Sequence, residues 1–128
     1  MKHLGTEYLE TQRLVLRRFT LEDAEAMFQN WASDTDVTKY LTWPAHKDAG
    51  ISRMVLNEWV NAYSRADKYQ WAIALKESPA EPIGSISVVY LDDSVASAQI
   101  GYCIGRRWWH KGITSEALKR VMDYFLMK

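Results

Sequence analysis

One stretch of the chain, residues 98–118 with the sequence AQIGYCIGRRWWHKGITSEAL, constrains the fold more than any other. Its first part is an apolar run that ends at Ile104 and is typical of a β-strand. A short polar and aromatic loop follows, with Gly112 near its end, and a helical pattern starts at Thr114 or Ser115. A strand, a glycine-bearing turn and a helix N-terminus bring backbone N–H groups together around an anion. The stretch therefore predicts an anion-binding turn.

Length and composition predict one ordinary globular domain. A chain of 128 residues, with 48% hydrophobic and 25% charged residues, has the size and make-up of a single soluble domain. Lys and Arg together number 16, as do Asp and Glu, so the net charge is zero, whereas a general polyanion binder is more basic. No apolar run reaches the ~20 residues of a membrane span. We therefore expect neither a nucleic-acid partner nor a membrane partner.

Cys103 is the only cysteine, so no intrachain disulfide is possible and a reducing cytoplasm is the expected compartment. Its place in an apolar strand pattern favours inert packing, with a site-lining role as the alternative. No cluster of Cys and His residues suggests a metal ion, and we expect none.

The hydrophobic period predicts the other elements of the fold. Apolar residues at helical or alternating spacing predict a strand at 12–18, helices at 21–32, 34–41 and 48–63, strands at 69–75, 83–91 and 98–104, and a last helix from about residue 115 to the end. Thr20 and Asp23 resemble a capping box at the start of the first helix. The last three strands are joined by short connections, a pattern typical of an antiparallel meander.

Two segments carry a resemblance to a known family. The sequence TQRLVLRRFTLEDAEAMF at 11–28 and the sequence IGYCIGRRWWHKGITSEAL at 100–118 resemble the GNAT superfamily of N-acetyltransferases. Within it, they are similar to the branch of ribosomal-protein alanine and serine N-terminal acetyltransferases. The resemblance implies an α/β GNAT fold, a mixed and mainly antiparallel sheet with flanking helices. It also implies that residues 1–128 form a single N-acetyltransferase domain, truncated after the acetyl-CoA-binding helix and lacking the family's C-terminal strand–helix–strand–strand portion.

The resemblance implies acetyl-CoA as the co-substrate. The family motif is Gln or Arg, two variable residues, Gly, one variable residue, then Gly or Ala, and it falls on residues 109–114, where Gly112 fits and Thr114 departs from it. The backbone from about His110 to Ser115 would hold the pyrophosphate, and the strand at Tyr102 would pair with the pantetheine arm. The implied cofactor-binding residues are Tyr102, Cys103, Ile104, Trp109, His110, Lys111, Gly112, Ile113, Thr114 and Ser115.

The resemblance leaves the catalytic and acceptor sites less defined. Many relatives carry a carboxylate where this chain has Gln99, so no catalytic acid or base is named. Tyr40, Trp43 and His46 lie in the segment that forms one wall of the family's acceptor groove. His46 is a candidate base near neutral pH, or else a solvated loop histidine. Trp43 is a candidate acceptor contact, or else a packing anchor.

Three functions remain open at this point. The first is acetyl transfer from acetyl-CoA to a primary amine, with a protein N-terminal amine as the leading acceptor. The second is acetylation of a small-molecule amine, such as an antibiotic or a polyamine. The third is a non-catalytic acyl-CoA-binding module, which Gln99 favours. The family also makes a homodimer possible.

Overall fold

An antiparallel sheet forms the centre of the computed structural model, which describes residues 5–39, 44–65, 68–90 and 98–127, without the side chains of 89, 90, 98, 99, 126 and 127. Within these residues the sheet has five strands in the order β1-β2-β3-β4-β5, and each strand pairs with its neighbours in antiparallel fashion. The strands are β1 (Leu9–Glu10), β2 (Leu14–Arg17), β3 (Tyr69–Leu75), β4 (Pro82–Tyr90) and β5 (Ala98–Ile104). The predicted mixed sheet is thus antiparallel throughout in this part of the chain.

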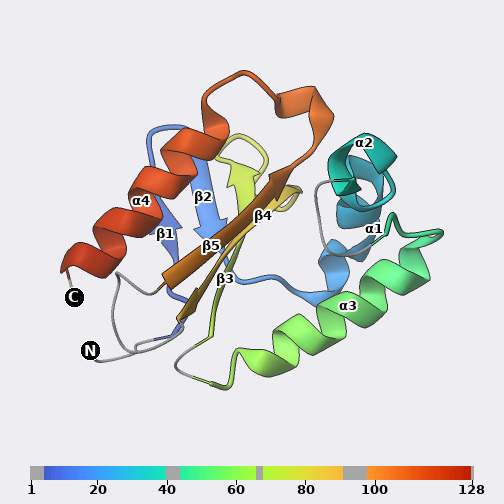
Figure 1. Ribbon diagram of the computed structural model, residues 1–128, viewed down its shortest axis with the longest axis horizontal. Coiled ribbons are helices and arrows are strands. Elements are labelled where there is room, and N and C mark those ends of the chain that lie inside the picture. Colours follow the sequence, from blue (N-terminus) through green and yellow to red (C-terminus); the bar gives the residue numbers. More distant parts are fainter. Residues whose placement is uncertain (1–4, 40–43, 66–67, 91–97, 128) are drawn as a thin grey trace.

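Helices cover both faces of the sheet, with α4 on one face and α1 to α3 on the other (Figure 1). The helical elements are η1 (Leu21–Asp23), α1 (Ala24–Met27), η2 (Phe28–Ala32), α2 (Thr35–Thr38), α3 (Ala49–Ala62), η4 (Arg106–Trp108) and α4 (Ile113–Met127). η1, α1 and η2 follow one another without a break, and η2 is a π-helical turn. None of the helices in the described ranges combines the length and apolarity needed to cross a bilayer.

Two hydrophobic cores result, one on each face of the sheet. On the α4 face, Trp71 and Ile73 of the sheet pack with Val121 and Phe125 of the helix, and all four are buried. Trp71 Nε1 also donates to the backbone oxygen of Glu7 at 2.6 Å, which satisfies its polar atom. This core holds α4, and therefore its N-terminus, against the sheet.

The second core lies under α1 and α3. Phe19, Trp31 and Leu56 are buried there. The hydroxyl of Tyr63 accepts from the backbone N–H of Phe19 at 2.9 Å and donates to the backbone oxygen of Gln70 at 2.8 Å. The Tyr63 hydroxyl, at the end of α3, thus joins the segment between β2 and η1 to β3 of the sheet.

The predicted elements are confirmed in order and in type. The Thr20 N–H donates to Asp23 Oδ2 at 2.8 Å, as the capping box requires. The predicted start of the last helix, at Thr114 or Ser115, was one or two residues too far along the chain, since α4 begins at Ile113. The two-residue strand β1 was missed, since so short a segment shows no period.

Candidate functional site

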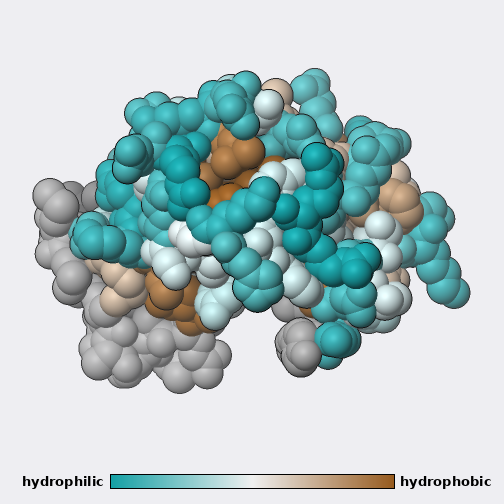
Figure 2. Space-filling view, turned by 90° about the horizontal axis from the view of Figure 1, so that it is seen from above, coloured by the Kyte–Doolittle hydropathy of each residue, from teal (hydrophilic) through white to brown (hydrophobic). Residues whose placement is uncertain are grey.

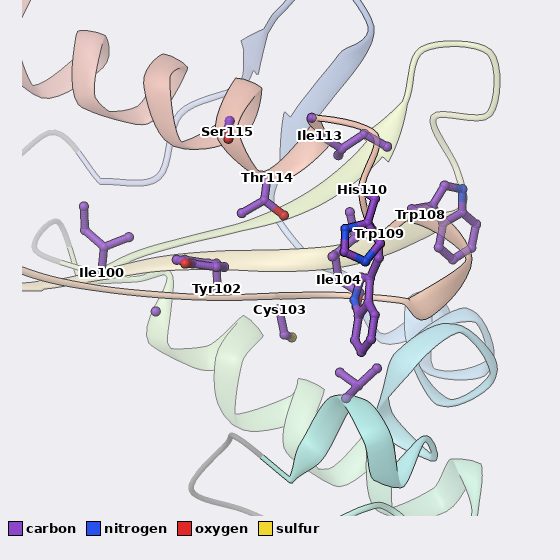
Figure 3. Close-up of a pocket in the computed structure, with 13 residues that line it drawn as sticks. Ile100, Tyr102, Cys103, Ile104, Trp108, Trp109, His110, Ile113, Thr114 and Ser115 are labelled. Carbon is purple, nitrogen blue, oxygen red and sulfur yellow. The ribbon is translucent and has the colours of Figure 1, made fainter.

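A pocket with a volume of about 860 Å³ lies where β5, the loop after it and the start of α4 meet (Figure 3). That volume falls in the range of known small-molecule sites. The lining residues come from these three elements and from α2: Val37, Ile100, Gly101, Tyr102, Cys103, Ile104, Trp108, Trp109, His110, Gly112, Ile113, Thr114 and Ser115. Seen from above, the molecule shows an apolar hollow bordered by hydrophilic side chains (Figure 2).

The free edge of β5 forms one side of the pocket. β5 is the last strand of the sheet in the described residues, so only one of its edges pairs with β4. The Gly105 N–H donates to the Ile83 oxygen at 2.9 Å, and in an antiparallel ladder this bonding alternates along the strand. The backbone groups of Ile100, Tyr102 and Ile104 therefore point to the free edge. Such an edge can accept an extended ligand as an added strand.

The loop between β5 and α4 is shaped by two residues with positive φ. His110 has φ 64° and Gly112 has φ 74°, the left-handed region that glycine adopts readily and other residues rarely. The first α-helical bond of α4 follows at once, from the Glu116 N–H to the Gly112 oxygen at 3.1 Å. Helix geometry leaves the N–H groups of Ile113, Thr114 and Ser115 without partners inside the helix. Together with the helix dipole, they favour an anion at this position.

Side-chain contacts hold the front of the loop in place. Trp109 Nε1 donates to the Ile104 oxygen at 2.9 Å, one of the β5 carbonyls that face the free edge. Arg106 donates from Nε to Asp34 Oδ2 at 2.6 Å and from Nη1 to Asp36 Oδ2 at 2.7 Å. Partial burial raises the pKa of Asp34, but the bonds with Arg106 and the backbone outweigh it and leave that pKa below its usual range. The ion pairs join the loop to α2, which supplies Val37 to the pocket wall.

Arg13 and Glu116 hold the rear of the loop. Arg13 Nε donates to Glu116 Oε1 at 2.7 Å, and Arg13 Nη1 donates to the Lys111 oxygen at 3.0 Å. Glu116 Oε2 accepts from the Arg13 backbone N–H at 3.0 Å and from the Thr11 hydroxyl. Partial burial raises the pKa of Glu116, but the bonds from Thr11 and Arg13 outweigh it and leave that pKa below its usual range.

Glu116→Gln is expected to lower the unfolding free energy at neutral pH by about 1 kcal/mol, a small value because Arg13 is 45% exposed. The folded-state pKa of Glu116 lies below the unfolded one, so its stabilisation is present at neutral pH and is lost as the pH falls below the usual carboxyl range and through the folded-state pKa. Urea unfolding at several pH values should show wild type and variant converging in acid. A constant difference between them down to pH 3 would refute this role of the charge.

The pocket gathers the cofactor-binding residues that the sequence predicted, with one exception. Lys111 does not line the pocket, and its backbone oxygen instead accepts from Arg13. The pocket adds Val37, Ile100, Gly101 and Trp108 to the predicted set. Ile100 and Gly101 belong to the same strand as Tyr102 and could have been found from the period. No signal in the sequence marks Val37.

Most of the predicted acceptor and catalytic residues lie outside the part of the chain that the structure describes. Tyr40, Trp43 and the side chain of Gln99 lie outside the described residues. His46 is described, and it does not line the pocket.

His46 is buried, with 8% exposure, so it is not the solvated loop histidine of the alternative prediction. Its ring Nδ1 lies 2.7 Å from the hydroxyl of the fully buried Ser52, and its backbone N–H donates to the backbone oxygen of Ala32 at 2.8 Å. Burial lowers the pKa of the imidazole. The loop before α3 is therefore fixed to the preceding helical segment through His46.

Cys103 lines the pocket as a free thiol. It points away from the face of β5 that carries Tyr102 (Figure 3) and packs against the core under α1 and α3. Burial raises the pKa of the thiol, although Ser85, with Oγ 3.5 Å from the sulfur, partly offsets this. The thiol form is thus favoured at neutral pH, as in a packing residue. Among the described residues, no group of three or more His, Cys, Asp or Glu side chains could hold a metal ion.

Comparison with known proteins gives a family match. A family model described as an acetyltransferase (GNAT) domain matches residues 13–128. The uncharacterized N-acetyltransferase p20 of Bacillus licheniformis is 36% identical over 118 residues, which are 92% of this chain and 65% of that protein. This chain thus spans about two thirds of the length of that curated relative.

Solved structures share the fold. An acetyltransferase of the GNAT family from Bacillus anthracis aligns with a TM-score of 0.73 at 23% identity, over 92% of this chain and 65% of that one. The ribosomal L7/L12 α-N-protein acetyltransferase RimL, solved in complex with coenzyme A, aligns with a TM-score of 0.76 at 20% identity, over 93% of this chain and 67% of that one.

Proposed function

Because this chain belongs to the acetyltransferase (GNAT) family, we propose that it binds acetyl-CoA in the pocket between β5 and α4. The bound acetyl-CoA then transfers its acetyl group to a primary amine. The observation that carries this proposal is the loop at residues 110–115, in which two residues of positive φ precede the unpaired amides of a 15-residue helix. Such a turn provides several N–H donors for a diphosphate without needing a net positive charge. It fits a chain of zero net charge.

In this proposal the pocket residues divide into two groups. The diphosphate of acetyl-CoA lies at the amides of Gly112 to Ser115, and Trp109 and His110 form the entrance to that turn. The pantetheine arm pairs with the free edge of β5, where the backbone groups of Tyr102 and Ile104 face it. Cys103 bonds to β4 through its backbone and contributes only its side-chain surface. Lys111 contributes through its peptide group rather than by lining the pocket.

The chemistry is a direct transfer. The nitrogen of a deprotonated amine attacks the thioester carbon, the new C–N bond forms, and the C–S bond breaks to release the thiolate of coenzyme A. The oxyanion that develops on the carbonyl needs a hydrogen-bond donor, and an N–H at the free edge of β5 is placed to supply one. The Tyr102 N–H is the candidate, because Tyr102 lies between Ile100 and Ile104 in the middle of that edge. The proton of the amine leaves to a base for which we propose no residue.

We propose a protein N-terminal amine as the acceptor. The support is the resemblance of residues 11–28 and 100–118 to the ribosomal-protein branch of the family. The pocket also reaches α2, which supplies Val37 to its wall. We further propose a cytoplasmic location, where the lone thiol of Cys103 stays reduced.

The acceptor is tested by the release of free thiol from acetyl-CoA in the presence of different amines. Peptides with a free N-terminal alanine or serine are compared with the same peptides carrying an N-terminal acetyl group, with spermidine and with an aminoglycoside. The proposal expects turnover on the free peptides and none on the blocked ones. Turnover on spermidine or the aminoglycoside alone would overturn the acceptor, and acetyl-CoA binding without turnover on any amine would favour a binding module.

A further inference from the structure

Arg13, just before β2, touches the loop of the proposed cofactor site without lining the pocket. Its guanidinium donates from Nη1 to the Lys111 oxygen at 3.0 Å and from Nε to Glu116 Oε1 at 2.7 Å. A Cβ atom built on Gly112 would lie 3.6 Å from Arg13 Nη2, so the guanidinium lies against one side of that residue. Arg13 therefore contacts the loop at its tightest bend, next to the positive φ of Gly112.

The bond to Lys111 fixes the orientation of one peptide plane. The C=O of Lys111 and the N–H of Gly112 belong to the same peptide group, and in a trans peptide they point in opposite directions. No cis peptide bond occurs among the described residues. Since Arg13 holds the carbonyl on its own side, the Gly112 N–H is turned to the other side. Gly112 lines the pocket and Arg13 does not, so that other side is the pocket.

The bonds from Arg13 to Glu116 also reduce the negative charge beside the amides of α4. Glu116 puts a carboxylate in the first turn of α4, beside the amides that would bind a diphosphate. A like charge there would repel that ligand. Arg13 pairs with this carboxylate through its side chain and its backbone N–H, and Thr11 adds a third bond. The carboxylate is thereby held toward the start of β2.

We infer that Arg13 is a positioning residue for the diphosphate of acetyl-CoA: it turns the Gly112 N–H into the pocket and neutralises Glu116. This inference rests on the proposed function and deepens it. The residue acts through the loop and does not touch the ligand. Its effect is therefore confined to ligands that carry the diphosphate.

A comparison of two ligands, one with and one without the diphosphate, distinguishes a loss of diphosphate binding from a general loss of structure. Binding of acetyl-CoA and of S-acetylpantetheine, which lacks the diphosphate, is followed by NMR titration of the wild-type chain, Arg13→Met and Arg13→Lys. Arg13→Met is expected to weaken acetyl-CoA binding about tenfold or more, the effect of losing an oriented donor to a charged group, and to change S-acetylpantetheine binding less than about twofold. Arg13→Lys keeps the charge but not the two-pronged geometry, so an intermediate loss is expected.

A matched control removes a charge elsewhere. Arg53→Met changes an exposed arginine on α3, on the opposite face of the sheet, and should leave both affinities unchanged. Equal weakening of both ligands in Arg13→Met and Arg13→Lys, or unchanged acetyl-CoA binding in either, would overturn the inference. If the Arg13→Met variant does not fold, the comparison of the two ligands in the Arg13→Lys variant alone tests the inference. A wild-type chain that binds neither ligand would instead refute the proposed function.

Discussion

Replacing Gly112 by valine is expected to abolish measurable acetyl-CoA binding, with a loss of about a hundredfold or more. Gly112 has φ 74°, and a β-branched residue pays roughly 1–2 kcal/mol or more to adopt that conformation. The strain would be relieved by rotating the peptide away from the pocket, which removes the proposed N–H donors. The Cβ atom would also lie 3.6 Å from Arg13 Nη2, so the side chain would crowd the guanidinium that bonds to the Lys111 oxygen. Quenching of tryptophan fluorescence by acetyl-CoA provides the measurement, because Trp108 and Trp109 line the same pocket.

The control for this substitution is Gly50→Val. Gly50 lies in α3, and it is a described glycine for which no positive φ is found. Gly50 is the second residue of α3, so a general loss of stability from valine near the start of a helix is reproduced there without a change at the loop. We expect this variant to keep its affinity for acetyl-CoA. Normal affinity in Gly112→Val would refute the role of the turn.

Replacing Gly84 by alanine is expected to destabilise the fold by about 3 kcal/mol, the upper part of the range for overpacked cores. Gly84 lies on β4 opposite Ile104 of β5. A Cβ atom at this position would lie 2.4 Å from the backbone oxygen of Cys103 and 3.0 Å from the Cα of Ile104. Both are backbone atoms, so the two strands would have to separate. A melting temperature lower by roughly 10 °C should follow, measured by circular dichroism.

Gly101→Ala is the matched control, since Gly101 lies on β5 in the same ladder. Its Cβ atom would meet only the Ser87 hydroxyl, at 3.3 Å, and that side chain can rotate. We expect a change in melting temperature of no more than a few degrees. Equal effects of the two substitutions would show that strand glycines, and not the close approach of β4 to β5, set the stability.

The order of helices and strands could be predicted because the spacing of apolar residues along the sequence is regular in most elements. Residues 69–75 alternate over their whole length, so both their strand character and their place between neighbours follow from the sequence. The loop of the proposed cofactor site could be located because its strand, glycine and helix are consecutive in the sequence. Gly112 has a positive φ, which glycine adopts readily, while the positive φ of His110 was not predicted, since a single histidine does not mark such a position.

What could not be predicted depends on contacts between distant parts of the chain. Arg13 and Glu116 are 103 positions apart, and no local pattern pairs them. Arg106 reaches Asp34 across 72 positions, which is how α2 enters the pocket wall. The burial of His46 likewise depends on Ser52 and on the helical segment before it. Such environments arise only when the elements pack.

Calorimetric titration of acetyl-CoA into the wild-type chain tests the central claim most directly. We expect saturable binding of one acetyl-CoA per chain, because the turn, the free edge of β5 and the start of α4 are all present in it. A folded chain that gives no binding heat at any temperature, and no shift in melting temperature with millimolar acetyl-CoA, would contradict the assignment of this pocket as the cofactor site.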